Sequence, residues 1–193
     1  RDVSGACAGG GEARYMGVGT QLFGGRMYIA NATGCTQAWG AASHNVPYAV
    51  NRCGRGPACY NSLCENNAEF RPGMCLAVQQ QRARLAGKMA ELRNTTADTA
   101  LKTALTAWLD NQEDSEKSRE LSDAVLAALA DADHADERVR YILQNREHLV
   151  KKSMWMYGGD GWAYDIGYGG LDHVLATGED VNILIVDTEV YSN

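Results

Sequence analysis

Asp160 stands between Gly159 and Gly161, directly after the strand-like residues 149–157. Glycine has no Cβ, so the backbone of such a turn can approach a ligand closely. We expect a helix to begin at once after the turn, where its unpaired N–H groups and its dipole favour a phosphate. A carboxylate beside a phosphate needs a cation between them, and Mg²⁺ commonly takes one or two protein carboxylates together with phosphate oxygens. These residues therefore predict a magnesium and diphosphate site.

A second set of oxygen donors follows the next strand-like run. Residues 181–186 are β-branched and uncharged, and they lead to the Thr188 hydroxyl and the Val190 backbone carbonyl. Residues 162–177 have the length of one helix, so the segment predicts a βαβ unit with a right-handed crossover and parallel strands. The carboxyl ends of both strands then lie at one edge of the sheet, where ligands of open α/β sheets bind. Asp160 and the second set are therefore expected at the same edge.

The first zone, residues 1–74, is rich in Gly, Asn and Cys. Residues 26–30 predict a short strand, followed by a turn and a helix that starts near Thr36. Residues 45–70 show no sustained period, so we predict an ordered loop with a helix that starts near Cys64. Loops of this length are usually functional.

Residues 75–150 consist mostly of helix formers and predict a packed bundle or a pair of helical hairpins. We expect Met89 and Trp108 to lie in its core, and His134 and His148 to be solvated. Apolar residues recur at helical spacing throughout this zone: Leu85, Met89 and Leu92; Leu101, Leu105 and Leu109; Leu121, Val125 and Leu129; and Val139, Ile142 and Leu143.

Composition limits the class of protein. The chain has 193 residues, 45% hydrophobic residues and a formal net charge of -6, which predicts one globular domain or a part of one. No apolar run reaches the roughly 18–20 residues of a membrane span. The acidic balance argues against nucleic acid, whose binding depends on clustered Lys and Arg. We therefore expect a soluble chain whose partners are small molecules or proteins.

All six cysteines lie in the first two fifths of the sequence. The cysteine-free remainder is predicted to fold without them, so reduced thiols or metal ligands are favoured over the disulfides of a secreted domain, which stay an alternative. Four of them show no standard zinc or cluster spacing, and we expect them to be buried free thiols. These four are Cys53, Cys59, Cys64 and Cys75.

Residues 159–167 (GDGWAYDIG) and 187–193 (DTEVYSN) together resemble the thiamine diphosphate site of the pyruvate:ferredoxin (flavodoxin) oxidoreductase family. Further segments resemble the family in the same order, namely residues 5–9 (GACAG), Glu12, residues 30–35 (ANATGC) and residues 54–57 (GRGP). The helical zone is similar to the insertion of the long single-chain members, so the resemblance covers essentially the whole chain.

The resemblance implies an α/β fold with a parallel, thiamine diphosphate-binding sheet and a helical insertion, incomplete at the C-terminus. Residues 1–74 would form the first part of the cofactor- and cluster-binding domain, residues 75–150 the insertion, and residues 151–193 the magnesium–diphosphate βαβ unit. The family converts pyruvate and coenzyme A to acetyl-CoA and CO₂, and iron–sulfur clusters carry the electrons to ferredoxin or flavodoxin. The chain would then be part of a larger homodimeric enzyme, inactive alone, in the cytoplasm or in an organelle of an anaerobic eukaryote.

The resemblance also implies residue roles. Asp160, Thr188 and the Val190 carbonyl would hold Mg²⁺, and Asn193 would be a catalytic residue close to the substrate. Thiamine diphosphate would be surrounded by Glu12, Cys35, Gly159, Asp160, Gly161, Trp162, Thr188, Glu189, Val190, Tyr191, Ser192 and Asn193.

One motif departs from the family. Where the family has Cys-x-x-Cys, residues 7–10 are Cys-Ala-Gly-Gly. A [4Fe-4S] cluster normally takes four thiolates; Cys7 and Cys35 match two of them, and Gly10 stands at the position of a third. Two alternatives therefore stay open. One is a noncatalytic or degraded fragment that binds a partner or no ligand, and the other is a nonoxidative thiamine diphosphate decarboxylase, which needs no cluster.

Overall fold

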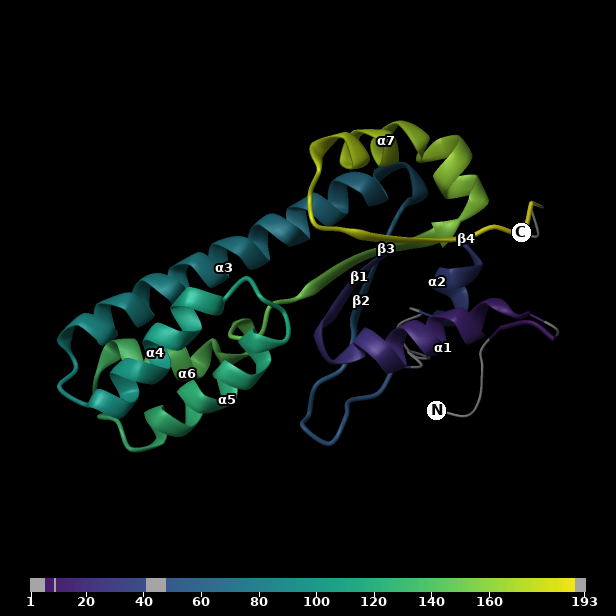
Figure 1. Cartoon of the computed structure of the whole chain (residues 1–193). Coiled ribbons are helices and arrows are strands. Elements are labelled where there is room, and N and C mark those ends of the chain that lie inside the picture. The colour runs from purple at the N-terminus through teal and green to yellow at the C-terminus, as the bar shows by residue number, and fades with distance from the viewer. Residues whose placement is uncertain (1–5, 9, 41–47, 190–193) are drawn as a thin grey trace. The chain divides into compact units, whose positions relative to one another are not determined.

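A computed structural model describes residues 6–8, 10–40 and 48–189. The chain forms two compact units, one made of Arg1–Cys75 with Ser153–Asn193 and the other of Leu76–Lys152. The second unit is thus inserted into the first, at positions within two residues of the limits expected at 74/75 and 150/151. The long helix α3 (Asn67–Thr95) runs from the first unit into the second (Figure 1).

The first unit is built on a four-stranded sheet in the order β2-β1-β3-β4. The strands are β1 (Met27–Ala32), β2 (Ala58–Ser62), β3 (Ser153–Gly159) and β4 (Asn182–Val186), and all three pairings between them are parallel. This confirms the α/β class and the parallel sheet. The chain leaves β1 for the neighbour on one side and later returns to the other side, so the strand order reverses between β1 and β3. Open α/β sheets bind ligands at such a switch point.

Helices cover both faces of this sheet (Figure 1). Because successive residues of a strand point to opposite faces, each strand contributes to two cores. Under α1 (Glu12–Phe23) and α2 (Cys35–Gly40) the core contains Met16, Met27, Ile29, Trp39 and Tyr157. Under α7 (Tyr168–Thr177) and the first turn of α3 it contains Ala32, Ala68, Met156, Trp162, Ala163, Leu171 and Val174.

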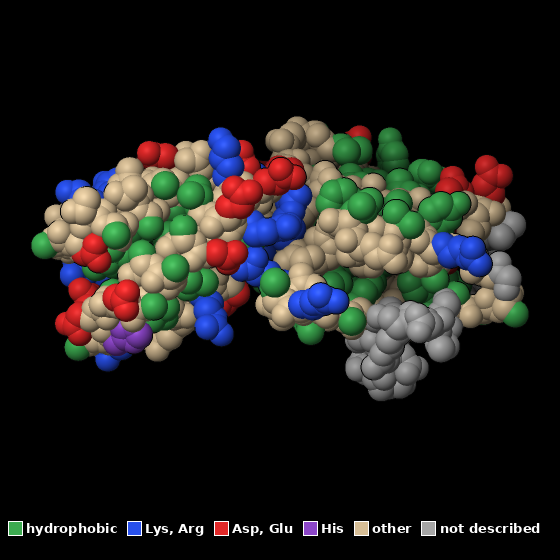
Figure 2. All heavy atoms as spheres, turned by 60° about the horizontal axis from the view of Figure 1, so that its bottom comes forward, with side chains coloured by type: hydrophobic (Ala, Val, Ile, Leu, Met, Phe, Trp, Pro, Cys, Tyr) green, Lys and Arg blue, Asp and Glu red, His purple; other side chains and the backbone are tan. Residues whose placement is uncertain are grey.

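The second unit is helical, as the periodicity predicts. It contains the rest of α3 together with α4 (Thr99–Asn111), α5 (Lys117–Ala130) and α6 (Glu137–Gln144). Met89 and Trp108 are fully buried, which confirms their core assignment. The predicted stripes supply the buried core of Leu85, Met89, Leu92, Leu101, Leu105, Val125, Leu129, Val139 and Ile142, to which Trp108 and Leu149 are added. On the face shown in Figure 2, acidic and basic side chains are interspersed over this unit.

Several elements differ from the prediction. The segment expected as a loop contains the short edge strand β2, whose residues show no alternation of buried and exposed side chains. The strand expected from residue 149 begins only at Ser153, because Leu149 packs into the helical core instead. The helix expected over 162–177 is divided into a π-helical segment, η4 (Gly161–Ile166), and α7.

Two expectations about side chains also need correction. His134 is exposed as expected, but the His148 side chain is only 14% exposed and is therefore not a solvated side chain. All six cysteines are free thiols; Cys75 is buried and Cys59 and Cys64 are half-buried, whereas Cys53 is exposed and therefore not a buried thiol. Searching the described residues for a helix that is both long and apolar enough to cross a membrane finds none.

Candidate functional site

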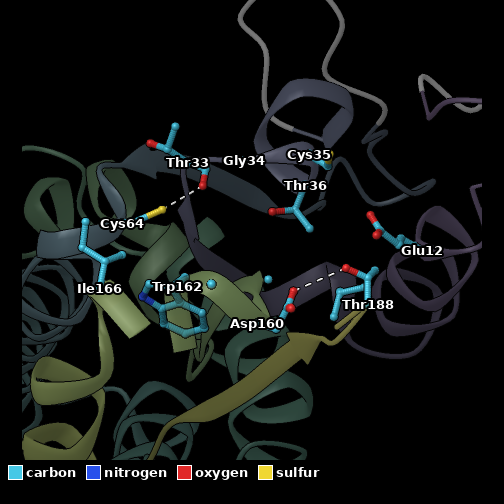
Figure 3. Close-up of a pocket in the computed structure, with 13 residues that line it drawn as sticks. Glu12, Thr33, Gly34, Cys35, Thr36, Cys64, Asp160, Trp162, Ile166 and Thr188 are labelled. Carbon is cyan, nitrogen blue, oxygen red and sulfur yellow. Dashed lines mark hydrogen bonds between the residues drawn. The ribbon is translucent and has the colours of Figure 1, made fainter. Parts of the chain in front are cut away.

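A cavity of about 370 Å³ lies at the carboxyl edge of the sheet, between the ends of β1 and β3 (Figure 3). This is the switch point of the strand order. Its walls come from five separate segments of the first unit, so it exists only once the sheet has formed. It is lined by Glu12, Thr33, Gly34, Cys35, Thr36, Cys64, Gly159, Asp160, Gly161, Trp162, Ile166, Val186 and Thr188.

Asp160 and Thr188 meet in this cavity. The Thr188 hydroxyl donates a hydrogen bond to Asp160 Oδ1 across 3.4 Å (Figure 3). The register explains the contact: β3 and β4 are parallel neighbours, with Gly159 opposite Val186, so the residues that follow each strand emerge at the same edge. The structure therefore brings together the two side chains that the βαβ pattern places at one edge.

Trp162 shapes the turn that carries Asp160. Its indole is 2% exposed and fills the space next to two glycines. A Cβ added at Gly158 would lie 2.3 Å from Trp162 Cε3, and one added at Gly167 would lie 2.5 Å from Trp162 Cδ1. The Gly167 N–H donates to the Trp162 carbonyl at 2.8 Å, which closes a π-type turn. Such turns are rare and often occur at functional sites.

Replacing Gly158 with alanine is expected to destabilise the first unit by about 1–3 kcal/mol, because the added methyl group meets the buried Trp162 ring and overpacks the core. Gly159→Ala is the matched control, since its added Cβ would find only the Val186 carbonyl oxygen, at 3.8 Å. Thermal unfolding of the cofactor-free, full-length protein measures both variants. Equal melting temperatures for the two would contradict this account of the turn.

The opposite wall is the turn between β1 and α2. Gly34 has a φ of +150°, a backbone conformation that residues other than glycine rarely adopt. Two hydrogen bonds join this turn to the end of β2 and to the segment after it: Thr33 Oγ1 donates to the Ser62 carbonyl at 2.8 Å, and Cys64 Sγ donates to the Thr33 carbonyl at 2.9 Å. Burial raises the pKa of the Cys64 thiol, which therefore stays protonated as a donor.

Of the other residues that the family resemblance implies for the site, some line the cavity and others do not. Glu12, at the start of α1, points into the cavity from the side of Thr188 (Figure 3). Cys35 lines the cavity, whereas Cys7 is exposed and does not. Within the described ranges, no group of three or more His, Cys, Asp or Glu side chains is placed to hold a metal ion. Glu189 follows Thr188 but does not line the cavity, and four expected site residues lie outside the described residues: Val190, Tyr191, Ser192 and Asn193.

Sequence reasoning missed several lining residues. Thr33, Thr36, Cys64 and Ile166 line the cavity although none of them was predicted as a site residue; Thr33 and Ile166 lie within the family-like segments 30–35 and 159–167. Thr33 and Thr36 flank the turn that was predicted after the first strand, so the position of that turn at a strand's carboxyl end is the signal that could have found them. Ile166 belongs to the segment 159–167 that resembles the family's cofactor site, whereas Cys64 carries no comparable signal.

Comparison with known proteins identifies relatives over the whole chain. It is 50% identical over 192 residues to a pyruvate-flavodoxin oxidoreductase of Klebsiella pneumoniae, and 50% identical over 197 residues to a pyruvate:ferredoxin oxidoreductase of Moorella thermoacetica. A mitochondrial pyruvate dehydrogenase [NADP(+)] of Euglena gracilis is 45% identical over 193 residues. The chain spans 16%, 17% and 11% of the lengths of these three proteins. Their names give three different electron acceptors, so this segment does not by itself identify the acceptor.

A family model described as "Pyruvate-ferredoxin oxidoreductase, insertion domain" matches residues 81–136. All of these residues belong to the helical second unit. The relatives match across the first unit as well, including the cavity at the switch point. The chain therefore belongs to the pyruvate:ferredoxin (flavodoxin) oxidoreductase family.

Proposed function

We propose that this chain is the part of a longer enzyme that binds thiamine diphosphate and Mg²⁺. The complete enzyme would decarboxylate pyruvate oxidatively with coenzyme A to acetyl-CoA and CO₂, and would pass electrons through iron–sulfur clusters to ferredoxin or flavodoxin. The observation that carries the proposal is the pairing of Asp160 with Thr188 in the switch-point cavity of a chain half identical to such enzymes.

The donor atoms fit the proposed cation. Two ligands at right angles around Mg²⁺, each about 2.1 Å from the ion, lie about 3.0 Å apart. The Asp160 and Thr188 oxygens are 3.4 Å apart, so a small adjustment would bring both into one octahedral shell. A carboxylate and a hydroxyl are hard oxygen donors, as Mg²⁺ requires, and the Val190 carbonyl is proposed as a third ligand. A diphosphate and water would complete the shell.

The cavity also fits the proposed cofactor in size, since ligand pockets typically enclose about 300–1,000 Å³ and this one encloses about 370 Å³. When bound, thiamine diphosphate supplies the carbanion and the electron sink that decarboxylation of pyruvate requires. The chain's own residues would hold the cation and the cofactor and orient them. Asp160 and Thr188 would anchor the cation, the backbone of residues 159–162 would approach the diphosphate, and Trp162 and Ile166 would exclude water. Glu12 and Cys35 would face the cofactor, and Asn193 the substrate.

The test uses the full-length enzyme as a homodimer with all its domains. Calorimetric titration with thiamine diphosphate is expected to show binding with Mg²⁺ and none after its removal by chelation. Pyruvate and coenzyme A should then reduce an artificial viologen acceptor. Release of CO₂ without viologen reduction would instead favour the nonoxidative decarboxylase, and absence of binding would favour the noncatalytic alternative.

The cluster is tested at Gly10. Its N–H donates to the Cys7 carbonyl at 2.9 Å, and an added Cβ would lie 3.1 Å from that oxygen and 3.3 Å from the Ala6 Cβ, which a small shift accommodates. Gly10→Cys is expected to raise the iron content of the full-length protein by up to about four atoms per chain, because it restores a missing thiolate. The control is Gly11→Cys, whose added Cβ meets nothing within 4 Å. Iron analysis that gives the same value for both variants would exclude Gly10 as a ligand position.

A further inference from the structure

A second pocket adjoins the cofactor cavity at the carboxyl edge of the sheet. It lies where β1 and β2 end, encloses about 450 Å³ and shares Thr33 with the cavity. None of the described residues that line it is charged, whereas Glu12 and Asp160 line the cavity. We call it the amide pocket, because side-chain amides are prominent in its lining, which consists of Thr33, Gln37, Asn61, Ser62, Leu63, Asn66 and Phe70.

Two fully buried asparagines hold the lining of the amide pocket in place. Asn31 Nδ2 donates a hydrogen bond to Asn61 Oδ1 at 3.4 Å. Asn67 Oδ1 accepts a hydrogen bond from Ser62 Oγ at 2.7 Å. Within the described chain, Asn31 Oδ1 and Asn67 Nδ2 have no hydrogen-bond partner. Buried polar atoms without a partner are rare and costly, so stability alone does not explain why two of them lie beside this pocket.

The lining of the amide pocket indicates the class of ligand. Side-chain amides offer both donors and acceptors, so they suit a ligand that carries amide or hydroxyl groups of its own. Leu63 and Phe70, which are 54% and 36% exposed, add apolar surface for methylene and methyl groups. A phosphate would need a cationic side chain or a metal ion, and the lining supplies no charged group. The pocket therefore suits an uncharged chain of amide and methylene groups.

We propose that the amide pocket binds the pantetheine arm of coenzyme A. The arm is an uncharged chain that carries amide groups, a hydroxyl and a terminal thiol. The inference rests on the proposed function, in which this thiol takes the acetyl group and must therefore reach the cofactor cavity. Because Thr33 lines both spaces, an arm in the amide pocket lies directly beside that cavity. The charged nucleotide end of coenzyme A would lie outside the amide pocket.

The experiment is a calorimetric titration of the full-length enzyme with coenzyme A. Gln37→Met and Asn66→Leu each remove one amide at similar volume, and neither residue lines the cofactor cavity. Combined, they are expected to raise the Kd for coenzyme A about 10–100-fold, because each lost hydrogen bond costs about 3–10-fold in affinity. The Kd for the nucleotide part alone, without the arm, should stay within about twofold. Such binding would also show that the double variant is folded.

The matched control combines Gln79→Met with Asn94→Leu, since both side chains are exposed on α3 outside the amide pocket. It should bind coenzyme A like the unmodified enzyme. Equal affinity of the two double variants for coenzyme A would overturn the inference, as would an equal loss of affinity for the nucleotide part. In both cases the proposed function would stand if the unmodified enzyme binds thiamine diphosphate only with Mg²⁺. Failure of the unmodified enzyme to bind that cofactor would overturn both.

Discussion

Replacing Asp160 with alanine is expected to abolish Mg²⁺-dependent binding of thiamine diphosphate by the full-length enzyme. Asp160 supplies the carboxylate that pairs with Thr188, and Glu12 is the other carboxylate among the residues lining the cavity. Loss of an outer-shell partner typically costs about 10–100-fold in metal affinity, so removal of a proposed direct ligand should exceed about 100-fold. Pyruvate-dependent viologen reduction should be lost together with the binding.

The control for this experiment is Asp172→Ala, which removes the same charge from an exposed position on α7 outside the cavity. Calorimetric titration of both variants, with and without Mg²⁺, separates loss of a ligand from a general change in charge. Tight Mg²⁺-dependent binding by the Asp160→Ala enzyme would refute the proposed metal site. Equal weakening in both variants would show that the effect is electrostatic and not local.

Replacing Arg82 with methionine is expected to destabilise the helical second unit by about 3–5 kcal/mol, because the partly buried carbonyls of His148 and Gln112 lose a charged donor and the Leu149 carbonyl keeps only the Trp108 indole N–H. The Arg82 side chain donates to the carbonyls of His148, Leu149 and Gln112. Its guanidinium also lies 5.5 Å from the ring of Trp108, a distance that allows a cation–π interaction. Methionine keeps much of the volume but donates nothing.

Hydrogen exchange of the peptides that cover α4 and α6, measured in the full-length protein, reports this loss directly. Those peptides should exchange much faster in Arg82→Met, while peptides from the sheet of the first unit should change little. Arg84→Met is the matched control, because Arg84 is exposed on the same helix. Protection of α4 and α6 equal to that in the control would show that the buried arginine does not hold the unit together.

Much of the fold could be predicted because its signals are local. The helices of the second unit follow from apolar residues repeated at helical spacing, and residues such as Leu85, Leu105 and Val125 are buried as that spacing requires. Likewise the run of residues 181–186 predicts β4, and the handedness of crossovers makes it parallel to β3. The meeting of Asp160 with Thr188 follows from these two rules, so the centre of the candidate site was within reach of sequence reasoning.

The rest of the site depends on contacts between residues that are distant in the chain. Strand β2 lies at the edge of the described sheet and pairs only with β1. Its side chains are half-buried or exposed, so its residues show no alternating pattern that would predict a strand. The π-helical turn accommodates the buried Trp162 ring only because Gly158 and Gly167 leave free the space that a Cβ would need, and no local pattern predicts that packing.

The sequence by itself determined the helical insertion, the parallel βαβ unit and the edge at which Asp160 and Thr188 lie, because hydrophobic period and crossover handedness act along short stretches of chain. Only the tertiary structure decided which side chains complete the cavity and which hold the turns in place. Cys64 and Ile166 reach the site through packing across strands and helices, and the buried Arg82 lies where three distant carbonyls converge on it. Such convergence is a property of the folded chain and leaves no periodic trace in its residues.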